Sequence, residues 1–153
     1  MYSIDKRILD FIHRHHVLTL ATCADATPYC AHLFYAYIDD DNVFVVASEA
    51  RTRHLDEALK NPRVAGAVVL ETKVVGLLRG LQWQGVLFLP DGELQRKARR
   101  AYLRRFPFAV LHNAPLWAIR PTFLKYTDNR LGFGKKIIVT LQANEKSPLY
   151  EDQ

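Results

Sequence analysis

Short β-rich runs separated by turn signals make up most of this chain, and they constrain its fold more than any other feature. Each such run leaves backbone donors and acceptors along two edges, and an open sheet of this size would expose edges that invite pairing with other chains. A closed or split antiparallel barrel hides those edges. The sequence therefore predicts a mainly β (α+β) fold, a six- to seven-stranded antiparallel split β-barrel, with strands near residues 17–23, 29–38, 43–47, 63–71, 73–89, 116–126 and 135–141.

Two or three helices are expected to flank the barrel. An amphipathic helix over residues 3–16 has an apolar stripe that includes Ile8 and Phe11, with Ser3 placed as its N-cap. A shorter helix near 52–60 stops at Asn61-Pro62, and a third is expected over 92–105. Glycines within 73–89 predict bulges or close backbone approach in that extended segment.

The length and composition indicate one ordinary globular domain. The 153 residues fit a single domain over 1–153, with a loose polar tail at 143–153. Hydrophobic residues make up 49% of the chain, yet no apolar run approaches the roughly 18 residues that a membrane span needs. Because the first residues lack the apolar region of a secretory signal, a cytoplasmic protein without membrane attachment is expected.

The cysteines and the histidine cluster do not predict a metal site. Cys23 and Cys30 lack zinc-ligand spacing and are expected to be reduced thiols, although a hairpin turn over 24–29 would place them opposite each other. His13, His15 and His16 fall at the end of the first expected helix. A helix C-terminus favours positively charged side chains, and this explains the three histidines better than metal ligation does.

The segment after the strand at 43–47 gathers polar and cationic side chains. Ser48 follows the strand directly, and Arg51, Thr52, Arg53 and His54 lead into the next helix. Hydroxyls, cations and unpaired helix amides at such a junction can hold a phosphate. The alternative is an ordinary exposed turn in which Thr52 acts as N-cap.

A nucleic-acid function is not expected, although the net charge is +5. The helix at 92–105 is the most basic segment, with Arg96, Lys97, Arg99, Arg100, Arg104 and Arg105. Aromatic side chains that could stack on bases are scarce on that face, because Tyr102 belongs to the apolar stripe. A solvated basic surface is therefore the favoured interpretation.

The order of these segments resembles that of the pyridoxamine 5′-phosphate oxidase-like split barrels that bind FMN. The resemblance runs through Leu18-Thr19-Leu20-Ala21-Thr22, Pro28, the strand ending at Ser48, Thr52-Arg53-His54 and Asn61-Pro62-Arg63-Val64. The later segments Leu116-Trp117-Ala118-Ile119 and Leu131-Gly132-Phe133-Gly134 most resemble those of the uncharacterised bacterial YhbP-like family.

This resemblance implies a set of FMN-binding residues at a homodimer interface. Ser48, Thr52, Arg53 and His54 match the positions that grip the FMN phosphate, with His54 standing where the pattern prefers lysine. His32 stands near an arginine position on the strand along which the flavin ring lies. Gln82 and Gln84 look like glutamines that approach the cofactor from the partner subunit, and a solvated strand face is the alternative for them.

The resemblance implies an FMN-dependent oxidoreductase acting on an unknown small substrate. No catalytic residue can be assigned from spacing, which suits a protein whose cofactor carries the chemistry. The oxidase's carboxy-terminal Arg-x-His segment has no counterpart in residues 142–153, so vitamin B6 oxidation is not supported. The alternative is a non-catalytic module on the same barrel that binds flavin or haem.

Overall fold

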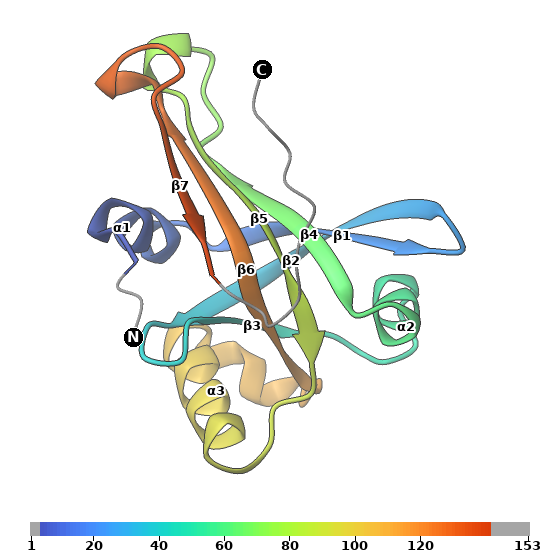
Figure 1. Ribbon diagram of the computed structural model, residues 1–153. Helices are drawn as coiled ribbons and strands as arrows, with labels where there is room; N and C mark the ends of the chain where they lie inside the picture. Colours follow the sequence, from blue (N-terminus) through green and yellow to red (C-terminus); the bar gives the residue numbers. More distant parts are fainter. Residues whose placement is uncertain (1–3, 142–153) are drawn as a thin grey trace.

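The computed structural model describes residues 4–141, which form one seven-stranded antiparallel sheet with three α-helices around it (Figure 1). The strand order is β3-β2-β1-β4-β5-β6-β7, and β3 also pairs with β6. This extra pairing closes a ring of six strands and leaves β7 on the outer edge of β6. The predicted split barrel is thereby confirmed; its strands are β1 Val17–Ala24, β2 Thr27–Ile38, β3 Val43–Ala47, β4 Arg63–Val69, β5 Arg79–Phe88, β6 Leu116–Asp128 and β7 Lys136–Thr140.

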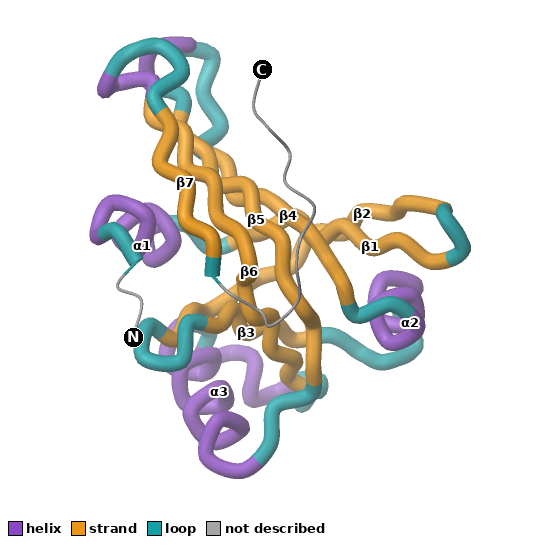
Figure 2. Tube along the Cα trace, viewed as in Figure 1, coloured by secondary structure: helices purple, strands orange, loops and turns teal. Residues whose placement is uncertain are grey.

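The helices cover different parts of the barrel. They are α1 (Lys6–Arg14), α2 (Arg53–Lys60) and α3 (Gly92–Arg105). Short 3-10 turns lie between these elements and the strands, at η1 (Val75–Leu77), η2 (Pro107–Leu111) and η3 (Asn129–Leu131). The β1–β2 hairpin projects from the barrel next to α2 in Figure 2. Among the described helices, none has both the length and the apolar character needed to cross a membrane.

The first helix begins later than the sequence predicted. Its N-cap is Asp5, whose carboxylate accepts a hydrogen bond of 2.9 Å from the backbone N–H of Arg7. A carboxylate at this position accepts a hydrogen bond from an otherwise unpaired helix amide. Its negative charge also interacts favourably with the positive end of the helix dipole. The helix then ends at Arg14 rather than near His16. The predicted cap, Ser3, lies outside the described residues, as does the predicted tail at 143–153.

Strand β3 is buried on both faces, which explains its uninterrupted apolar run. Phe44 and Val46 belong to the main core inside the barrel, together with Trp83 of β5. Val43 and Val45 point the other way and pack in a second cluster with Ala98 and Tyr102 of α3. Strand β3 therefore separates the barrel interior from the layer formed by α3.

The hairpin turn is shorter than the 24–29 turn that would have placed Cys23 opposite Cys30. Asp25 and Ala26 form a two-residue turn in which both have positive φ, at 51° and 57°, as two-residue hairpin turns require. This turn pairs Cys23 with Pro28 and Cys30 with Ala21, so the two thiols are not opposite each other. Both cysteines are free and exposed.

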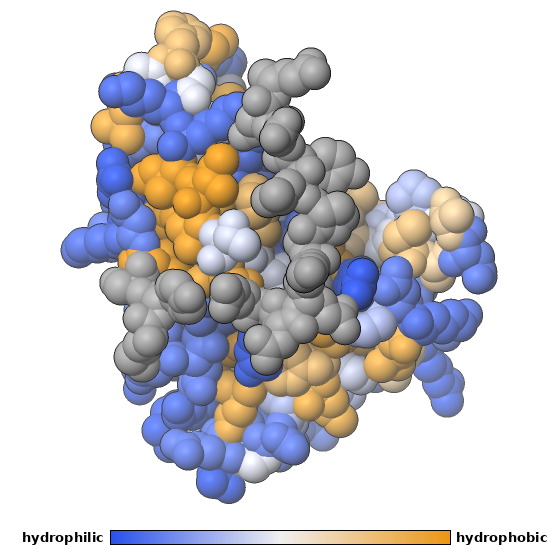
Figure 3. All heavy atoms as spheres, in the orientation of Figure 1, coloured by the Kyte–Doolittle hydropathy of each residue, from blue (hydrophilic) through white to orange (hydrophobic). Residues whose placement is uncertain are grey.

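The extended segment predicted over 73–89 is two elements rather than one. Turn η1 occupies its first part, and β5 begins at Arg79. The predicted bulge is confirmed, because the pairing with β6 shifts between Gln84 and Gly85. Hydrophobic side chains also reach the surface over β7 and at the end of the molecule formed by η1 and η3, where Val75 and Phe133 are exposed (Figure 3).

Candidate functional site

Three polar side chains at the end of β3 form a closed hydrogen-bonded group, here called the Ser48 cluster (Ser48, Thr52 and His54). The Ser48 hydroxyl lies 2.7 Å from Nε2 of His54 and 3.1 Å from the Thr52 hydroxyl. Thr52 Oγ1 lies 3.1 Å from the same imidazole nitrogen. The structure therefore brings together three of the four residues that the resemblance implied for a phosphate site.

The fold holds the Ser48 cluster at an open edge of the sheet. Ser48 donates its backbone N–H to the carbonyl of Pro115 at 3.1 Å, and its own carbonyl accepts a 3.0 Å bond from the indole N–H of Trp117. Strand β3 pairs with β2 over residues 35–38. Among the described strands, none continues this pairing along residues 27–34 of β2. The cluster thus lies next to the part of the β2 edge to which no described strand is hydrogen-bonded on the β3 side.

Helix α2 begins beside the Ser48 cluster without a side-chain cap. Thr52 occupies the predicted N-cap position, but its hydroxyl donates to the carbonyl of Glu49 at 2.8 Å and makes no capping bond. The first amides of a helix lack intrahelical partners and carry the positive end of its dipole. The start of α2 can therefore offer backbone donors to an anion.

His54 contributes hydrogen bonding rather than charge. Its imidazole is half-buried, and burial lowers its pKa below the usual value of 6.5. At neutral pH the ring is therefore uncharged, with one nitrogen as donor and the other as acceptor. A lysine at this position would have supplied a permanent positive charge.

The lowered pKa of His54 predicts a loss of stability in mild acid. Below about pH 6.5 the unfolded chain binds a proton at this histidine that the folded chain binds only at lower pH, so folding loses free energy as the pH falls. The fall in melting temperature between about pH 7.5 and pH 5.5 is expected to be larger for the natural protein than for His54→Gln, which keeps a hydrogen-bonding side chain. Equal falls in the two proteins would contradict this role of His54.

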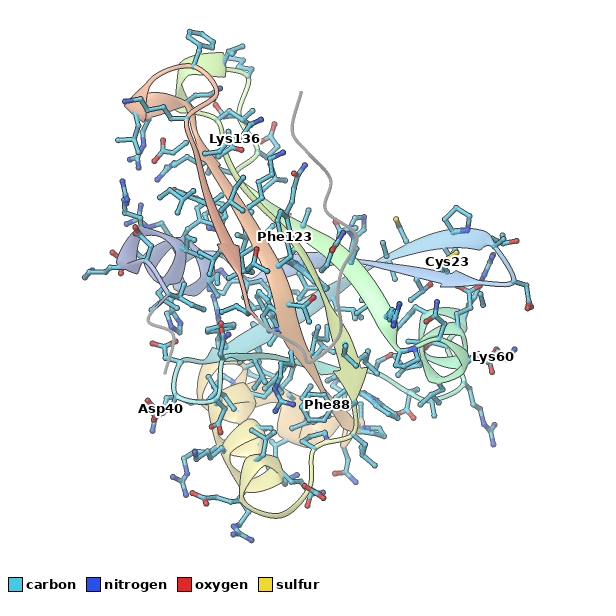
Figure 4. All side chains as sticks on the ribbon, viewed as in Figure 1. Cys23, Asp40, Lys60, Phe88, Phe123 and Lys136 are labelled. Atoms are coloured by element: carbon cyan, nitrogen blue, oxygen red, sulfur yellow. The ribbon has the colours of Figure 1, made fainter. Side chains whose placement is uncertain are left out.

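Arg53 points away from the Ser48 cluster toward the β1–β2 hairpin. Its Nε donates to Glu57 at 2.9 Å, and its guanidinium lies 4.2 Å from the centre of the Tyr29 ring. The hydroxyl of Thr22 donates to the other oxygen of Glu57 at 2.6 Å. These contacts, the Thr22 bond first, lower the pKa of Glu57. Figure 4 shows Lys60 at the far end of α2 beneath the hairpin that carries Cys23.

No sequence signal placed Thr22 at this site. The spacing of Arg53 and Glu57 fits an ion pair on one helix face, but Thr22 is distant in sequence and meets them through the packing of α2 on β1. The terminal nitrogens of Arg53 make no hydrogen bond within the described residues. They remain available to a ligand.

His32, Gln82 and Gln84 lie on one exposed face of the sheet. In the sheet register His32 lies opposite Thr19, Thr19 opposite Ala67, and Ala67 opposite Gln82. His32 and Gln82 therefore belong to the same cross-strand row, with β1 and β4 between them. The imidazole of His32 lies 3.3 Å from the hydroxyl of Thr19. Within one chain, the structure does not bring the glutamines to the Ser48 cluster.

An apolar cavity of about 440 Å³ lies on the other side of the β3 end, between α3 and η2. Phe34 of β2 and Ala47 of β3 contribute to its wall, and Phe106 and Phe108 line it on the helical side. Because Ala47 directly precedes Ser48, the cavity and the Ser48 cluster flank the same strand end. The Phe106-Pro107-Phe108 run after α3 is the one local sequence signal for this cavity, and it did not predict a cavity by itself.

Comparison with known proteins establishes the class of this chain. The sequence profile of the family described as pyridoxamine 5′-phosphate oxidase matches residues 4–125, and the chain belongs to that family. The resemblance expected from the sequence is confirmed at this level. The chain is also 38% identical to a UPF0306 protein of Yersinia pestis bv. Antiqua (strain Angola), over 83% of this chain and 86% of the relative.

Solved structures share the fold at low sequence identity. A haem-binding protein from Mycobacterium smegmatis superposes with a TM-score of 0.74 at 18% identity, over 92% of this chain. The present chain spans 60% of that protein's length. A FAD-binding protein from Mesorhizobium loti gives a TM-score of 0.64 at 20% identity, over 78% of this chain and 88% of that one.

Proposed function

We propose that this protein is a cytoplasmic homodimer that binds FMN at the subunit interface and carries out oxidoreductase chemistry on a small substrate. The observation that carries the proposal is the Ser48 cluster, in which two hydroxyls and an imidazole meet within 3.1 Å of one another beside the start of α2. Membership of the pyridoxamine 5′-phosphate oxidase family supports a flavin phosphate as the ligand.

The donor set at the end of β3 fits a phosphate group. Ser48 supplies a hydroxyl donor, and the first turn of α2 supplies backbone N–H groups. Thr52 would supply a second donor by turning its hydroxyl from the carbonyl of Glu49, and Arg53 would supply its terminal guanidinium nitrogens by turning from Tyr29 toward the cluster. Phosphate oxygens accept hydrogen bonds from such groups, and bonds to a charged acceptor are stronger than those between neutral groups. A phosphate would take the hydrogen bonds that the two hydroxyls now make with each other and with His54.

Each subunit would contribute a different surface to the cofactor. The uncovered edge of β2 at residues 27–34 supports a ring placed beside the Ser48 cluster, close to His32. Gln82 and Gln84 are exposed on β5 and face outward from their own barrel, which supports a contact with a second copy. Bound flavin would supply the electron transfer, while these residues bind and orient it.

A non-catalytic module that holds flavin or haem is the second candidate. The neutral state of His54 favours it, because a site without fixed charge from this residue binds phosphate less tightly than one with lysine. The structural similarity to a haem-binding protein supports haem as an alternative ligand.

A visible absorption spectrum of the purified protein distinguishes these candidates. The protein is mixed with FMN, freed of unbound flavin by gel filtration, and then supplied with NADH or NADPH. Retained flavin bands that bleach with the nicotinamide and recover in air support an oxidoreductase. Retained bands that never bleach favour the binding module, and haem uptake with a Soret band but no flavin retention contradicts FMN as the cofactor.

Arg53→Ala is expected to weaken FMN binding about three- to tenfold, because it removes a partly exposed cation from the phosphate site. Lys60→Ala, at the other end of the same helix, is the matched control and is expected to leave the affinity unchanged. Both affinities can be measured by quenching of FMN fluorescence. Equal affinity of the Arg53 variant and the natural protein would remove Arg53 from the phosphate site.

A further inference from the structure

Arg53 is held between helix α2 and the β1–β2 hairpin, on the side away from the Ser48 cluster. Its Nε donates to Oε1 of Glu57 at 2.9 Å, and its guanidinium carbon lies 4.2 Å from the centre of the Tyr29 ring. Thr22 and Tyr29 are directly opposite each other in the hairpin, so both side chains leave it on the same face. Here Thr22, Tyr29 and Glu57 are called the Arg53 clamp.

Glu57 is the fixed part of the Arg53 clamp. Its side chain is 11% exposed, and its second oxygen accepts a 2.6 Å hydrogen bond from the hydroxyl of Thr22, which is itself buried. A buried carboxylate needs such partners, because an unpaired charge in the interior is costly. The bond from Thr22 therefore holds Glu57 in place whether or not Arg53 stays with it.

The contacts that hold Arg53 are weak enough for a ligand to break. Its side chain is 55% exposed, and an ion pair or an arginine–aromatic contact at an exposed site contributes little. A phosphate group is a stronger partner, since its oxygens accept two parallel hydrogen bonds from a guanidinium. None of the described contacts of Arg53 joins it to Ser48, Thr52 or His54. The guanidinium therefore has two alternative partners, the clamp and an anion at the Ser48 cluster.

We infer that Tyr29 and Glu57 withhold Arg53 from the phosphate site of the free protein, and that a phosphate bound at the Ser48 cluster draws the guanidinium off the Tyr29 ring. Tyr29 is then a positioning residue, which sets the affinity through Arg53 without touching the ligand. Because only the molecules with a released Arg53 bind at full strength, the clamp lowers the apparent affinity. The identity of the phosphate as that of FMN rests on the function proposed above.

Tyr29 can be changed without altering the charge of the site or the face of β2 beside it. Successive side chains of a strand point to opposite faces, so Tyr29 and His32 lie on different faces of β2. The Tyr29 hydroxyl makes no hydrogen bond within the residues that the structure describes. Its ring is thus the part that contacts Arg53, and Tyr29→Phe keeps that part. Glu57→Gln is less informative, because it removes a negative charge beside the proposed phosphate site and would change the affinity even without Arg53.

FMN binding by variants of the full chain tests the role of Tyr29. Tyr29→Leu is expected to raise the affinity for FMN about two- to fivefold, because it removes one exposed arginine–aromatic contact from the free protein. Tyr29→Phe is expected to match the natural protein. In a chain that already carries Arg53→Ala, Tyr29→Leu is expected to change nothing, since its effect acts through the missing guanidinium. Quenching of flavin fluorescence gives each affinity, and riboflavin, which has no phosphate, is expected to bind all variants alike.

Nuclear magnetic resonance of the ¹⁵N-labelled protein follows Arg53 directly. Its Nε–H signal is identified by its loss in Arg53→Ala, and in the free protein it reports the hydrogen bond to Glu57. Saturating FMN is expected to shift this signal, and inorganic phosphate is expected to shift it in the same direction. Tyr29→Leu is expected to reach the shifted position at a lower phosphate concentration. This measurement depends on neither bound flavin nor turnover.

Three results would overturn the inference. Weaker FMN binding in Tyr29→Leu would mean that the ring presents Arg53 to the phosphate rather than withholding it. An equal gain with and without Arg53 would mean that Tyr29 acts through the hairpin. An unchanged affinity, or an Nε–H signal that neither FMN nor phosphate shifts, would mean that no release takes place. Absence of FMN binding, together with a phosphate-induced shift that Tyr29→Leu facilitates, would count against the proposed function alone.

Discussion

Replacement of Gly66 by alanine is expected to destabilise the protein by about 3 kcal/mol or more, which would lower the melting temperature by roughly 6–12 °C. Gly66 lies in β4, and a Cβ atom at this position would stand 2.1 Å from the carbonyl oxygen of Thr19 and 2.1 Å from the Trp83 ring. Neither group can withdraw easily. The Thr19 carbonyl belongs to the neighbouring strand, and Trp83 is 1% exposed in the centre of the core.

Gly76→Ala is the matched control for this effect. Gly76 lies in η1, where an added Cβ would meet nothing within 4 Å. Its replacement is expected to change the free energy of unfolding by no more than about 0.5 kcal/mol. Thermal unfolding followed by circular dichroism measures both variants. A melting temperature of Gly66→Ala close to that of Gly76→Ala would show that the strands or the indole can shift at little cost.

Ser48→Ala is expected to weaken FMN binding by about ten- to hundredfold, the range for losing a hydrogen bond to a charged group. The Ser48 hydroxyl contacts both Thr52 and His54, and its 2.7 Å contact with Nε2 of His54 is the shortest within the cluster. Its removal takes away one phosphate donor and leaves the other two without the contact that orients them. Quenching of FMN fluorescence on titration with protein measures the loss.

Riboflavin separates a phosphate effect from a general one, because it has the same ring system and no phosphate. Its affinity is expected to be the same for Ser48→Ala and the natural protein. A parallel loss of FMN and riboflavin affinity would mean that the substitution disturbs the ring site or the fold. An unchanged FMN affinity would remove Ser48 from the phosphate site.

Local patterns in the sequence were enough to predict most elements of the barrel. The apolar run at 43–47, the polar residues that follow and the Asn61-Pro62 stop all act within a few residues, and the structure confirms the strand, the turn and helix α2 at these positions. The predicted third helix is also confirmed as α3. Such signals succeed because caps, turns and apolar periodicity are properties of neighbouring residues.

Predictions that depended on register or on distant partners were less complete. Cys23 and Cys30 would have been opposite each other only with a turn over 24–29, and a two-residue turn sets a different pairing of the hairpin. The ion pair of Arg53 with Glu57 was open to prediction from helix spacing, but the bond from Thr22 was not. The contact of Trp83 with Gly66 likewise needs two strands to be paired first.

The sequence by itself determined where β3 ends, where α2 begins, and that Ser48, Thr52, Arg53 and His54 stand at that junction. Tertiary structure alone decided that Ser48, Thr52 and His54 share hydrogen bonds while Arg53 turns to Glu57 and Tyr29. It also decided that a cavity opens beside Ala47. The reason is physical: an element forms from its own residues, whereas the direction of a side chain and the space beside it depend on which surfaces pack together once the chain has closed.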